Sequence, residues 1–443
     1  MWQKTERTVF ITSFHGLISR NILSTSLFGI LRERGIKIVL LVPEYKASFF
    51  KKEYERDGIA VEEINWKLSR TDLIFRYISL ALLNTRTLQI KRKTEMKGSG
   101  AWLTRFIGNR KWARIFFRQA SALFTPRRRF GVLIDKYQPD LIFSTDLQNE
   151  LDVSLIHEAR DRKVKIVGMV RSWDNLTSKG VLRVLPDRMV VWNEIVKQEA
   201  VDFADIRPER ISIIGIPHYD AYVKGNRTPR SDFYASMKLD LSKRFIVFAP
   251  TGDRYIANNT IDRDIVSILQ GVLPGTYQLL VRLPPGDIVN LAGLKVSGAV
   301  RIDDPGTHFG VKKAMELSFE DDRRLADTLF YCDLLVTGPS TIAIDAVVFG
   351  KPVIFVAFDG YENRKYYEGM ERFLDYTHIR HIIESQGVSV ARSQDEFMRL
   401  ILEYLGGSSK GSAGRKRLVE IECFKLDGGS TQRLANEIIS NIG

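Results

Sequence analysis

The chain has 443 residues, more than one hydrophobic core usually holds, so its length predicts two domains of about 200 residues each. A hydrophobic content of 44% and a charged content of 27% exclude a disordered protein, and the two cysteines, Cys332 and Cys423, have neither the spacing of a metal site nor that of a disulfide framework. No stretch approaches the roughly 18 apolar residues of a membrane span and the start of the chain lacks a signal-peptide pattern, so we expect a protein of the reducing cytoplasm that does not cross a bilayer.

The first half of the chain alternates predicted strands with predicted helices, which is typical of a mostly parallel sheet. It opens with a strand over residues 8–13, an amphipathic helix over 21–34 and a second strand over 37–42. Further short apolar strands are predicted at 141–144, 166–170, 188–192 and 211–215, with a helix over 151–162.

Nearly all of the excess positive charge lies in residues 86–129, which we call the basic segment. It holds thirteen Lys or Arg against one acid, Glu95, in a chain with a formal net charge of +13. Apolar side chains interleave with these cations at spacings that a helix sorts into an aromatic face and a basic face: Trp102, Phe106, Ile107, Trp112, Ile115, Phe116, Phe117 and Phe124. The pattern predicts a helix that binds an anionic membrane surface. A solvated basic helix is the alternative, and because no nucleic-acid motif is present we expect no nucleic-acid partner.

Polar residues follow the predicted strands of the first half where each strand ends, at the edge that faces the ligand in doubly wound sheets. After the first strand, His15 is a candidate general base, because a neutral imidazole can remove a proton from a hydroxyl near pH 7. A loop histidine that caps a backbone group is the alternative. In the segment VRSWDNLTSKG, Asp174 is the second candidate base.

The same edge offers groups that can hold an acceptor through an anion, a hydroxyl or the face of a sugar ring. Those candidates are Arg171, Trp173, Asn175, Lys179 and, after the strand 141–144, Asp146. An Asp-Asn turn and a helix N-cap at Asp146 are the structural alternatives.

The apolar rhythm lapses over residues 224–243 and restarts with a strand at 245–249, so we place the domain boundary after residue 223. The second domain, residues 224–425, continues the same alternation of strands and helices. Its predicted elements are strands at 277–282, 334–337 and 353–356 and helices at 322–331, 341–349 and 395–405, followed by a last helix at 432–442.

The most informative segment is residues 337–355, TGPSTIAIDAVVFGKPVIF. Gly338, Ser340 and Thr341 follow a strand and open a helix, so N–H groups, hydroxyls and the positive end of the helix dipole point at an anion. An ordinary N-cap is the alternative. Asp345, on the same helix, either reaches a ribose hydroxyl or only favours the helix dipole.

Two further strand ends of the second domain carry Thr251 and Arg282. A guanidinium fork at a strand end suits a diphosphate, with an ion pair to Asp287 as the alternative. The six histidines form no HxH or HExxH group, so we predict no metal site, and there is neither a Walker loop nor a GxGxxG after the first strand.

Together these residues resemble glycosyltransferases of the GT-B fold, and more narrowly bacterial surface-polysaccharide enzymes related to the CDP-glycerol glycerophosphotransferase and capsule-transferase group. The motifs that carry the resemblance are RSWDNLTSKG, IIGIPHYDAY, GPSTIAIDAVVFGKPVIF and DGGSTQR. The resemblance implies an α/β fold with two Rossmann-like domains whose parallel sheets face each other across a cleft. It also implies that the last segment, residues 426–443, is a helix that crosses back to the first domain.

The resemblance further implies roles for the candidate residues. Ser340 and Thr341 would contact the donor phosphate, Thr251 and Arg282 would line the same pocket, and His15 would deprotonate the acceptor hydroxyl. No metal or cofactor would be needed, because the helix dipole and basic side chains offset the leaving group's charge. The chain departs from its relatives at Pro284, where a His-Pro pair is common, and at Asp345, where many GT-B enzymes carry Glu.

We therefore expect a glycosyltransferase that moves a sugar from a nucleotide-sugar donor to a hydroxyl of a lipid-linked or polymeric surface glycan. It would be a peripheral protein on the inner face of the cell membrane. The alternatives are a CDP-glycerol-type polyol-phosphate transferase, a sugar-nucleotide epimerase, and a non-catalytic protein that binds anionic lipid or nucleic acid.

Overall fold

The computed structural model describes residues 7–95, 104, 106–127, 129–295, 297–309 and 315–442. The chain divides into two compact units. Unit 1 comprises Met1–Gln89, Gly98–Lys224 and Cys423–Gly443, and unit 2 comprises Ile90–Lys97 and Gly225–Glu422. Residues 90–97 of the basic segment thus belong to unit 2, although the sequence pattern assigned the whole segment to the first domain.

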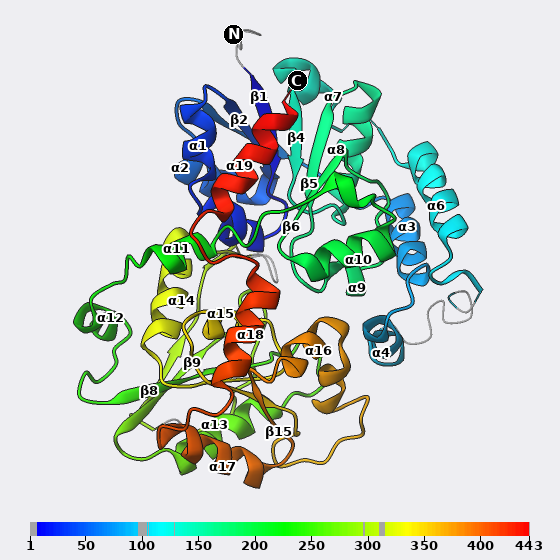
Figure 1. Ribbon diagram of the computed structural model, residues 1–443. Helices are drawn as coiled ribbons and strands as arrows, with labels where there is room; N and C mark the ends of the chain where they lie inside the picture. Colours follow the sequence, from blue (N-terminus) through cyan, green and yellow to red (C-terminus); the bar gives the residue numbers. More distant parts are fainter. Residues whose placement is uncertain are drawn as a thin grey trace. The chain divides into compact units, whose positions relative to one another are not determined.

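Unit 1 is built on a seven-stranded sheet with the strand order β3-β2-β1-β4-β5-β6-β7, in which every neighbouring pair is parallel (Figure 1). The order reverses between β1 and β4, which makes the carboxyl ends of these two strands the switch point where doubly wound sheets bind ligands. The strands are β1 Thr8–Thr12, β2 Lys37–Pro43, β3 Ile59–Ile64, β4 Leu141–Ser144, β5 Lys165–Met169, β6 Arg188–Val191 and β7 Ile211–Ile213.

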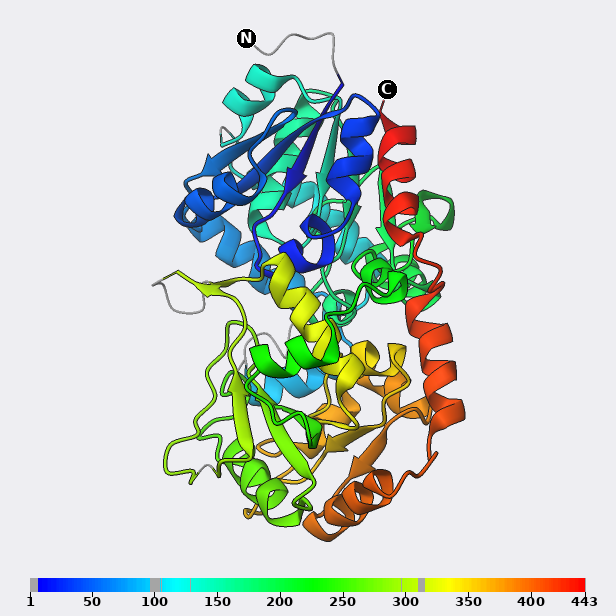
Figure 2. The ribbon, with the colours of Figure 1, turned by 90° about the vertical axis from the view of Figure 1, so that its left-hand side faces the viewer.

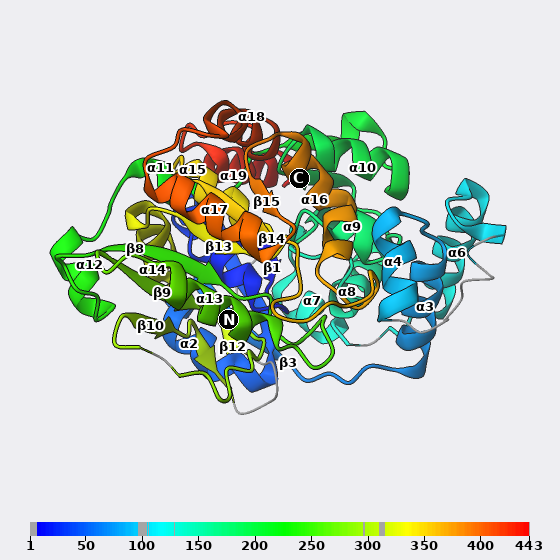
Figure 3. The same cartoon turned by 90° about the horizontal axis from the view of Figure 1, so that it is seen from below.

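Helices cover this sheet, and the last helix of the chain is among them. α19 packs beside α1 and against β4 and β5 (Figure 2), while α3 and α6 contact each other on another side of the unit (Figure 3). The helices are α1 Leu27–Glu33, α2 Ala47–Tyr54, α3 Arg70–Ala81, α6 Lys111–Phe124, α7 Gly131–Tyr137, α8 Glu150–Asp161, α9 Asn175–Ser178, α10 Glu194–Ala204, α11 Tyr219–Lys224 and α19 Ser430–Asn441, and α4 Arg86–Thr94 extends from unit 1 into unit 2.

Two of the motifs quoted above meet where α19 docks. The Asp220 carboxylate accepts the N–H groups of Ser430 and Thr431 at 3.0 and 2.7 Å and so caps the helix. Gly215, with φ of +80°, lies so close that an added Cβ would stand 2.5 Å from Ser430 Oγ. The segments IIGIPHYDAY and DGGSTQR therefore contact each other at the start of α19.

Unit 2 contains a six-stranded parallel sheet with the order β10-β9-β8-β13-β14-β15 and a separate antiparallel pair, β11 and β12. The order reverses between β8 and β13, so the ends of these strands form the second switch point. The strands are β8 Arg244–Ala249, β9 Tyr277–Arg282, β10 Val300–Asp303, β11 Thr307–His308, β12 Met315–Glu316, β13 Leu335–Thr337, β14 Val353–Val356 and β15 Ser389–Ala391. The helices are α12 Arg230–Ser236, α13 Ile261–Val272, α14 Phe319–Tyr331, α15 Ile342–Val348, α16 Thr377–Glu384, α17 Gln394–Leu405 and α18 Ser412–Cys423.

The predicted α/β class with two Rossmann-like parallel sheets is confirmed, but one predicted helix is wrong. The helix expected over residues 21–34 is split into a π-helical turn, Ser19–Leu23, and α1. Thr25 Oγ1 donates to the Ile22 carbonyl at 2.6 Å and accepts the Leu27 N–H at 3.3 Å. Because this hydroxyl takes over backbone partners that a continuous helix needs, the helix restarts after it. None of the helices in the described part of the chain has the length and apolar character to span a membrane.

Candidate functional site

At the switch point of unit 1, hydroxyl groups and a buried carboxyl group hold the ends of β1 and β4 together. Thr12 Oγ1 accepts the Thr145 N–H at 3.0 Å, and Thr145 Oγ1 donates to the Thr12 carbonyl at 2.8 Å. Asp152, on α8, accepts both Thr12 Oγ1 and Ser144 Oγ. The sequence interpretation missed Asp152, since a single acid inside a predicted helix gives no signal of its own.

Asp146 and Arg171, two predicted acceptor contacts, form an ion pair with each other. Asp146 is 3% exposed, and burial raises the pKa of its carboxyl group although Arg171 lowers it. The Arg171 carbonyl accepts Asn21 Nδ2 at 3.0 Å, which fixes the loop after β5 to the π-helical turn. The pair thus joins the loops that follow β4 and β5.

His15 lies on the loop after β1, partly exposed, and its Nδ1 accepts the Leu17 N–H at 3.2 Å. This bond places the proton of the neutral ring on Nε2, so Nδ1 would have to release Leu17 before it could take a proton. The capping contact expected as the alternative is therefore present. Asp174 is also partly exposed, and its Oδ2 accepts Ser178 Oγ at 2.6 Å.

The remaining acceptor candidates differ in their access to solvent. Trp173 and Lys179 are partly exposed, and Trp173 packs edge-on against Trp192 with ring centroids 4.3 Å apart. Asn175 is 0% exposed, and its amide atoms have no hydrogen-bond partner among the described residues. Asn175 thus contacts no solvent in this structure, and its predicted role in holding an acceptor stays a prediction.

In the basic segment, arginines anchor the helices rather than form a basic face. Arg114 bonds both oxygens of Asp205 at 3.0 and 2.7 Å, and Arg118 reaches the same carboxylate at 2.8 Å. Arg127 pairs with Asp161 at 3.1 Å. Residues 96–103, 105 and 128 of the segment, including Lys97, Trp102, Arg105 and Arg128, lie outside the described residues.

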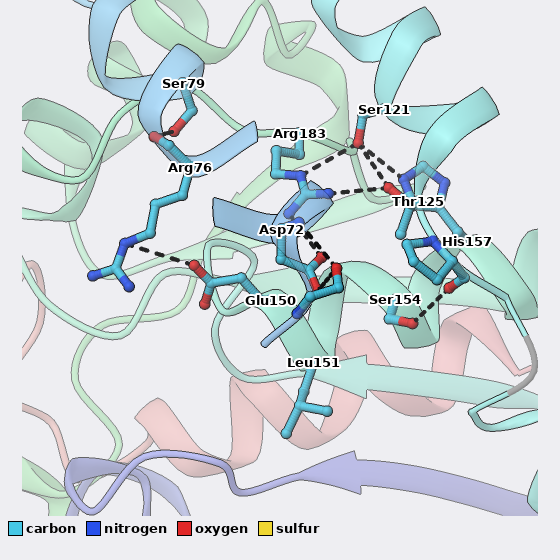
Figure 4. A network of polar contacts seen from close by, with 12 residues as sticks. Asp72, Arg76, Ser79, Ser121, Thr125, Glu150, Leu151, Ser154, His157 and Arg183 are labelled. Carbon is cyan, nitrogen blue, oxygen red and sulfur yellow. Dashed lines mark hydrogen bonds and ion pairs between the residues drawn. The ribbon is translucent and has the colours of Figure 1, made fainter. Parts of the chain in front are cut away.

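A second buried network ties α3 and α6 to the unit (Figure 4). Arg183, 5% exposed, lies 3.5 Å from Asp72 and donates to Thr125 Oγ1 at 3.0 Å and Ser121 Oγ at 3.4 Å. Ser121 Oγ is 3.4 Å from His157 Nε2. Burial, followed by the charges of Arg127 and Arg183, lowers the pKa of His157 to about 4, so this ring is neutral at pH 7.

In unit 2, the predicted donor residues Thr251 and Gly338 lie side by side at the switch point. A Cβ on Gly338 would stand 2.4 Å from Thr251 Oγ1 and 2.8 Å from Met370 Cε. A larger residue at this position would therefore require the side chain of Thr251 or Met370 to move. Ser340 and Thr341 follow, both partly exposed, and neither hydroxyl has a hydrogen-bond partner among the described residues.

Two carboxylates that the sequence interpretation missed hold this edge. Asp262 accepts the N–H groups of Thr251 and Gly252, each at 2.9 Å, together with Asn259 Nδ2 at 2.7 Å. Asp359, after β14, accepts the Met370 N–H at 2.7 Å. Asp262 lies at the start of a helix and Asp359 follows a strand. Many residues that only cap a helix or a turn occupy such positions, so the sequence does not single these two acids out.

Two further donor candidates, Arg282 and Asp345, are buried in unit 2. Arg282 is 5% exposed and forms an ion pair with Asp303, the residue beside it on the neighbouring strand β10. The partner is therefore not Asp287, and the guanidinium is not open to solvent. Asp345 is 3% exposed inside α15. Since α15 spans only seven residues, the Ser340 and Thr341 hydroxyls, which have no hydrogen-bond partner in the described part of the chain, make this turn more suitable for a phosphate than the helix dipole does.

Among the described residues, no group of three or more His, Cys, Asp or Glu side chains is placed to hold a metal ion. The two edges present hydroxyls, carboxylates, an imidazole and backbone N–H groups. Such groups can bind an activated phosphate in one unit and orient a hydroxyl acceptor in the other.

Comparisons with known proteins point to the same chemistry. The model of the family described as CDP-glycerol:poly(glycerophosphate) glycerophosphotransferase matches residues 183–440. The teichoic acid glycerol-phosphate primase of Bacillus spizizenii is 27% identical over 173 residues, which are 39% of this chain and 40% of that protein. The chain thus spans about two fifths of the length of the curated relative it matches.

Solved structures share the architecture over almost the whole chain. The wall teichoic acid polymerase TagF has a TM-score of 0.55 at 12% identity, covering 99% of this chain and 90% of that one. The UDP-GlcNAc 2-epimerase from Neisseria meningitidis bound to UDP-GlcNAc has a TM-score of 0.57 at 10% identity, covering 98% of this chain and 100% of that one. At such identities the likeness shows the fold alone, and that fold is GT-B.

Proposed function

Because the chain belongs to the CDP-glycerol:poly(glycerophosphate) glycerophosphotransferase family and is a transferase of the GT-B type, we propose that it transfers a polyol phosphate from a CDP-linked donor to a hydroxyl of a surface polymer. The observation that carries the proposal is the family match over residues 183–440. This range includes every donor candidate of unit 2, which together we call the donor edge: Thr251, Arg282, Gly338, Ser340, Thr341 and Asp345. The proposed reaction differs from the sugar transfer expected from the sequence alone.

In this reaction, unit 2 binds the diphosphate of the donor. Thr251, Ser340 and Thr341 supply hydroxyl donors, and Gly338 keeps the turn open. The acceptor oxygen attacks the phosphorus that carries the polyol, a new O–P bond forms, and the bond to the bridging oxygen breaks so that CMP leaves.

The proton of the acceptor hydroxyl goes to a base of unit 1, and Asp174 and His15 are the two candidates. We place Asp174 first, because a carboxylate that accepts the Ser178 hydroxyl can still take a proton, whereas Nδ1 of His15 has a single lone pair and it accepts the Leu17 N–H. Replacement of the true base is expected to lower kcat by about 100-fold or more while donor affinity stays unchanged. Comparison of D174N with H15A tells the two apart, and wild-type turnover in both variants would exclude them.

Sugar transfer from a nucleotide-sugar donor is the second candidate, favoured by Pro284 and Pro285 where the resemblance expects a His-Pro pair. There the acceptor oxygen would bond to the anomeric carbon and a nucleoside diphosphate would leave. The products separate the two reactions: CMP from CDP-glycerol supports the first, and UDP or GDP from a sugar nucleotide supports the second. A thermal-shift screen without stabilisation by any of these donors would contradict both.

We further propose that the protein works in the cytoplasm on the inner face of the cell membrane, where α6 lies in the anionic lipid surface. One face of α6 is exposed and apolar, with Trp112 64%, Phe116 69% and Leu123 76% exposed, and α3 adds Ile74 at 58%. Arg110 and Lys111 are exposed at the start of the same helix. Such a face suits insertion among lipid headgroups better than a soluble surface.

A further inference from the structure

Asp152 is a carboxyl group at 0% exposure that no step above uses. Its Oδ1 accepts Thr12 Oγ1 at 2.6 Å and Ser144 Oγ at 2.7 Å. These two residues end β1 and β4. A single side chain thus joins both strands at the switch point of unit 1.

The surroundings of Asp152 favour its neutral form. Its Oδ2 is buried and has no hydrogen-bond partner among the described residues, so a negative charge there would be uncompensated. Asp146 adds a second negative charge nearby, and Arg171, the cation that acts on Asp152, is already paired with Asp146. Burial and then Asp146 raise the pKa of Asp152 to about 8, although the hydroxyl groups of Thr12 and Ser144 that donate to it act in the opposite direction.

The strand ends that Asp152 joins lead straight into the loops that carry chemistry. His15 stands three residues after Thr12, and Asp146 stands two residues after Ser144. Asp146 in turn holds Arg171, and it also feels the charges of Lys179 and Asp174. A loosening at Asp152 therefore acts on the loop of His15 and, through Asp146, on Arg171.

We propose that Asp152 is a positioning residue that works as a neutral carboxyl group, tying the end of β1 to the end of β4 and so holding the loops of His15 and Asp146 in place. Loss of its proton leaves an uncompensated charge on Asp152 beside Asp146. The hydroxyl bonds of Thr12 and Ser144 favour that charge, but its repulsion with the Asp146 carboxylate opposes it and strains the two loops, so transfer slows as Asp152 ionises. The effect on transfer rests on the proposed function, whereas the tie itself does not.

The protonation state of Asp152 is tested first, without substrate. The infrared spectrum of the wild type minus that of D152N is expected to contain a carboxylic-acid C=O band at neutral pH that vanishes in alkaline buffer. Asp202, an exposed residue of α10 in the same unit, provides the control variant D202N, which should leave that band in place. A spectrum in which Asp152 is already a carboxylate at neutral pH would overturn the proposal.

The effect on transfer is tested by a pH profile. D152N keeps the shape of the neutral group, so its kcat/KM at neutral pH is expected within about threefold of the wild type, without the alkaline decline. D202N should follow the wild type throughout. An alkaline decline that is the same in D152N would refute the role in positioning, whatever donor the enzyme uses.

Should D152N fail to fold, hydrogen exchange of the wild type decides the matter. After correction for intrinsic rates, peptides that contain residues 12–18 and 144–149 are expected to exchange faster once Asp152 ionises, while β8 in unit 2 does not change. Equal protection of both loops on either side of the titration would refute the loosening on ionisation and with it the proposal.

Discussion

Gly338 is the residue on which the shape of the donor edge depends most directly. In G338A the added Cβ would meet Thr251 Oγ1 at 2.4 Å and Met370 Cε at 2.8 Å, so one of these groups must move. We expect donor affinity to fall by about tenfold, which is about 1.4 kcal/mol of binding free energy, measured by calorimetric titration.

The matched control is G271A in α13 of the same unit, because nothing lies within 4 Å of a Cβ added there. Alanine inside a helix should stabilise unit 2 by about 0.5–1 kcal/mol and leave donor binding unchanged. Equal donor affinity in G338A and the wild type would show that the close approach of Thr251 has no part in binding.

At the residue scale, the sequence could predict which residues reach the ligand-facing edges but not what they contact there. The positions of Thr251, Gly338, His15 and Asp174 after strands could be predicted, because the apolar runs that form the strands are easy to find in the sequence. Arg282, in contrast, turns to Asp303 on a strand that was not predicted. A partner that is distant in sequence leaves no local signal, and neither does the burial of Asn175.

At the scale of elements, the strands that escaped prediction share one property. β3, β10 and β15 each lie at the edge of a large sheet, and β11 and β12 pair only with each other, so each of these strands has a single neighbour. Edge strands are covered less and carry polar side chains, as in the sequences IAVEEI, VRID and SVA. The central strands, buried on both faces, read as continuous apolar runs and were found to within one or two residues.

In the basic segment, the helical periodicity was predicted correctly, but the basic face was expected to be exposed and much of it is not. Its amphipathic character was predictable, but Arg114, Arg118, Arg127 and Arg129 pair with carboxylates inside unit 1, and the apolar side of α6 is exposed. Neutralising these arginines would remove structural ion pairs. The membrane proposal is therefore better tested on the apolar face.

Replacement of Trp112, Phe116 and Leu123 by serine is expected to lower the affinity for anionic liposomes at least tenfold. The reason is that the variant no longer transfers these large apolar side chains from water into the lipid. Sedimentation with vesicles measures the change. The control replaces Leu241, Ile288 and Leu402, which are 50%, 53% and 52% exposed in unit 2, and should bind as the wild type does. Unimpaired binding of the α6 variant would show that the face has another purpose.

At the scale of the molecule, two buried groups of unit 1 act on its stability in opposite directions as the pH changes. Asp152 has a pKa raised from 3.8 to about 8, so the folded state holds a proton that the unfolded chain releases, and stability is lost as the pH rises through this window. His157 has a pKa lowered from 6.5 to about 4, so stability is lost as the pH falls through that window.

Each group alone changes the free energy of unfolding by about 1.4 kcal/mol per pH unit, and the two contributions offset each other where the windows overlap. Relative to the wild type, D152N is expected to gain stability steadily from about pH 4 to about pH 8, and H157Q to gain it as the pH falls below about 6.5. Urea unfolding at several pH values measures both. Curves parallel to the wild type would mean that these groups titrate alike in the folded and unfolded states.

The return of α19 to unit 1 has a consequence for how the protein is made on the ribosome. All of the strands of unit 2 are translated before Ser430–Asn441, the helix whose Leu434, Ala435 and Ile438 are buried in unit 1. At a synthesis rate of about 5–20 residues per second, the nascent first unit waits on the order of 10–40 seconds for its last helix. During that interval the surface that α19 will cover is open to chaperones, while unit 2 emerges and can fold without interruption.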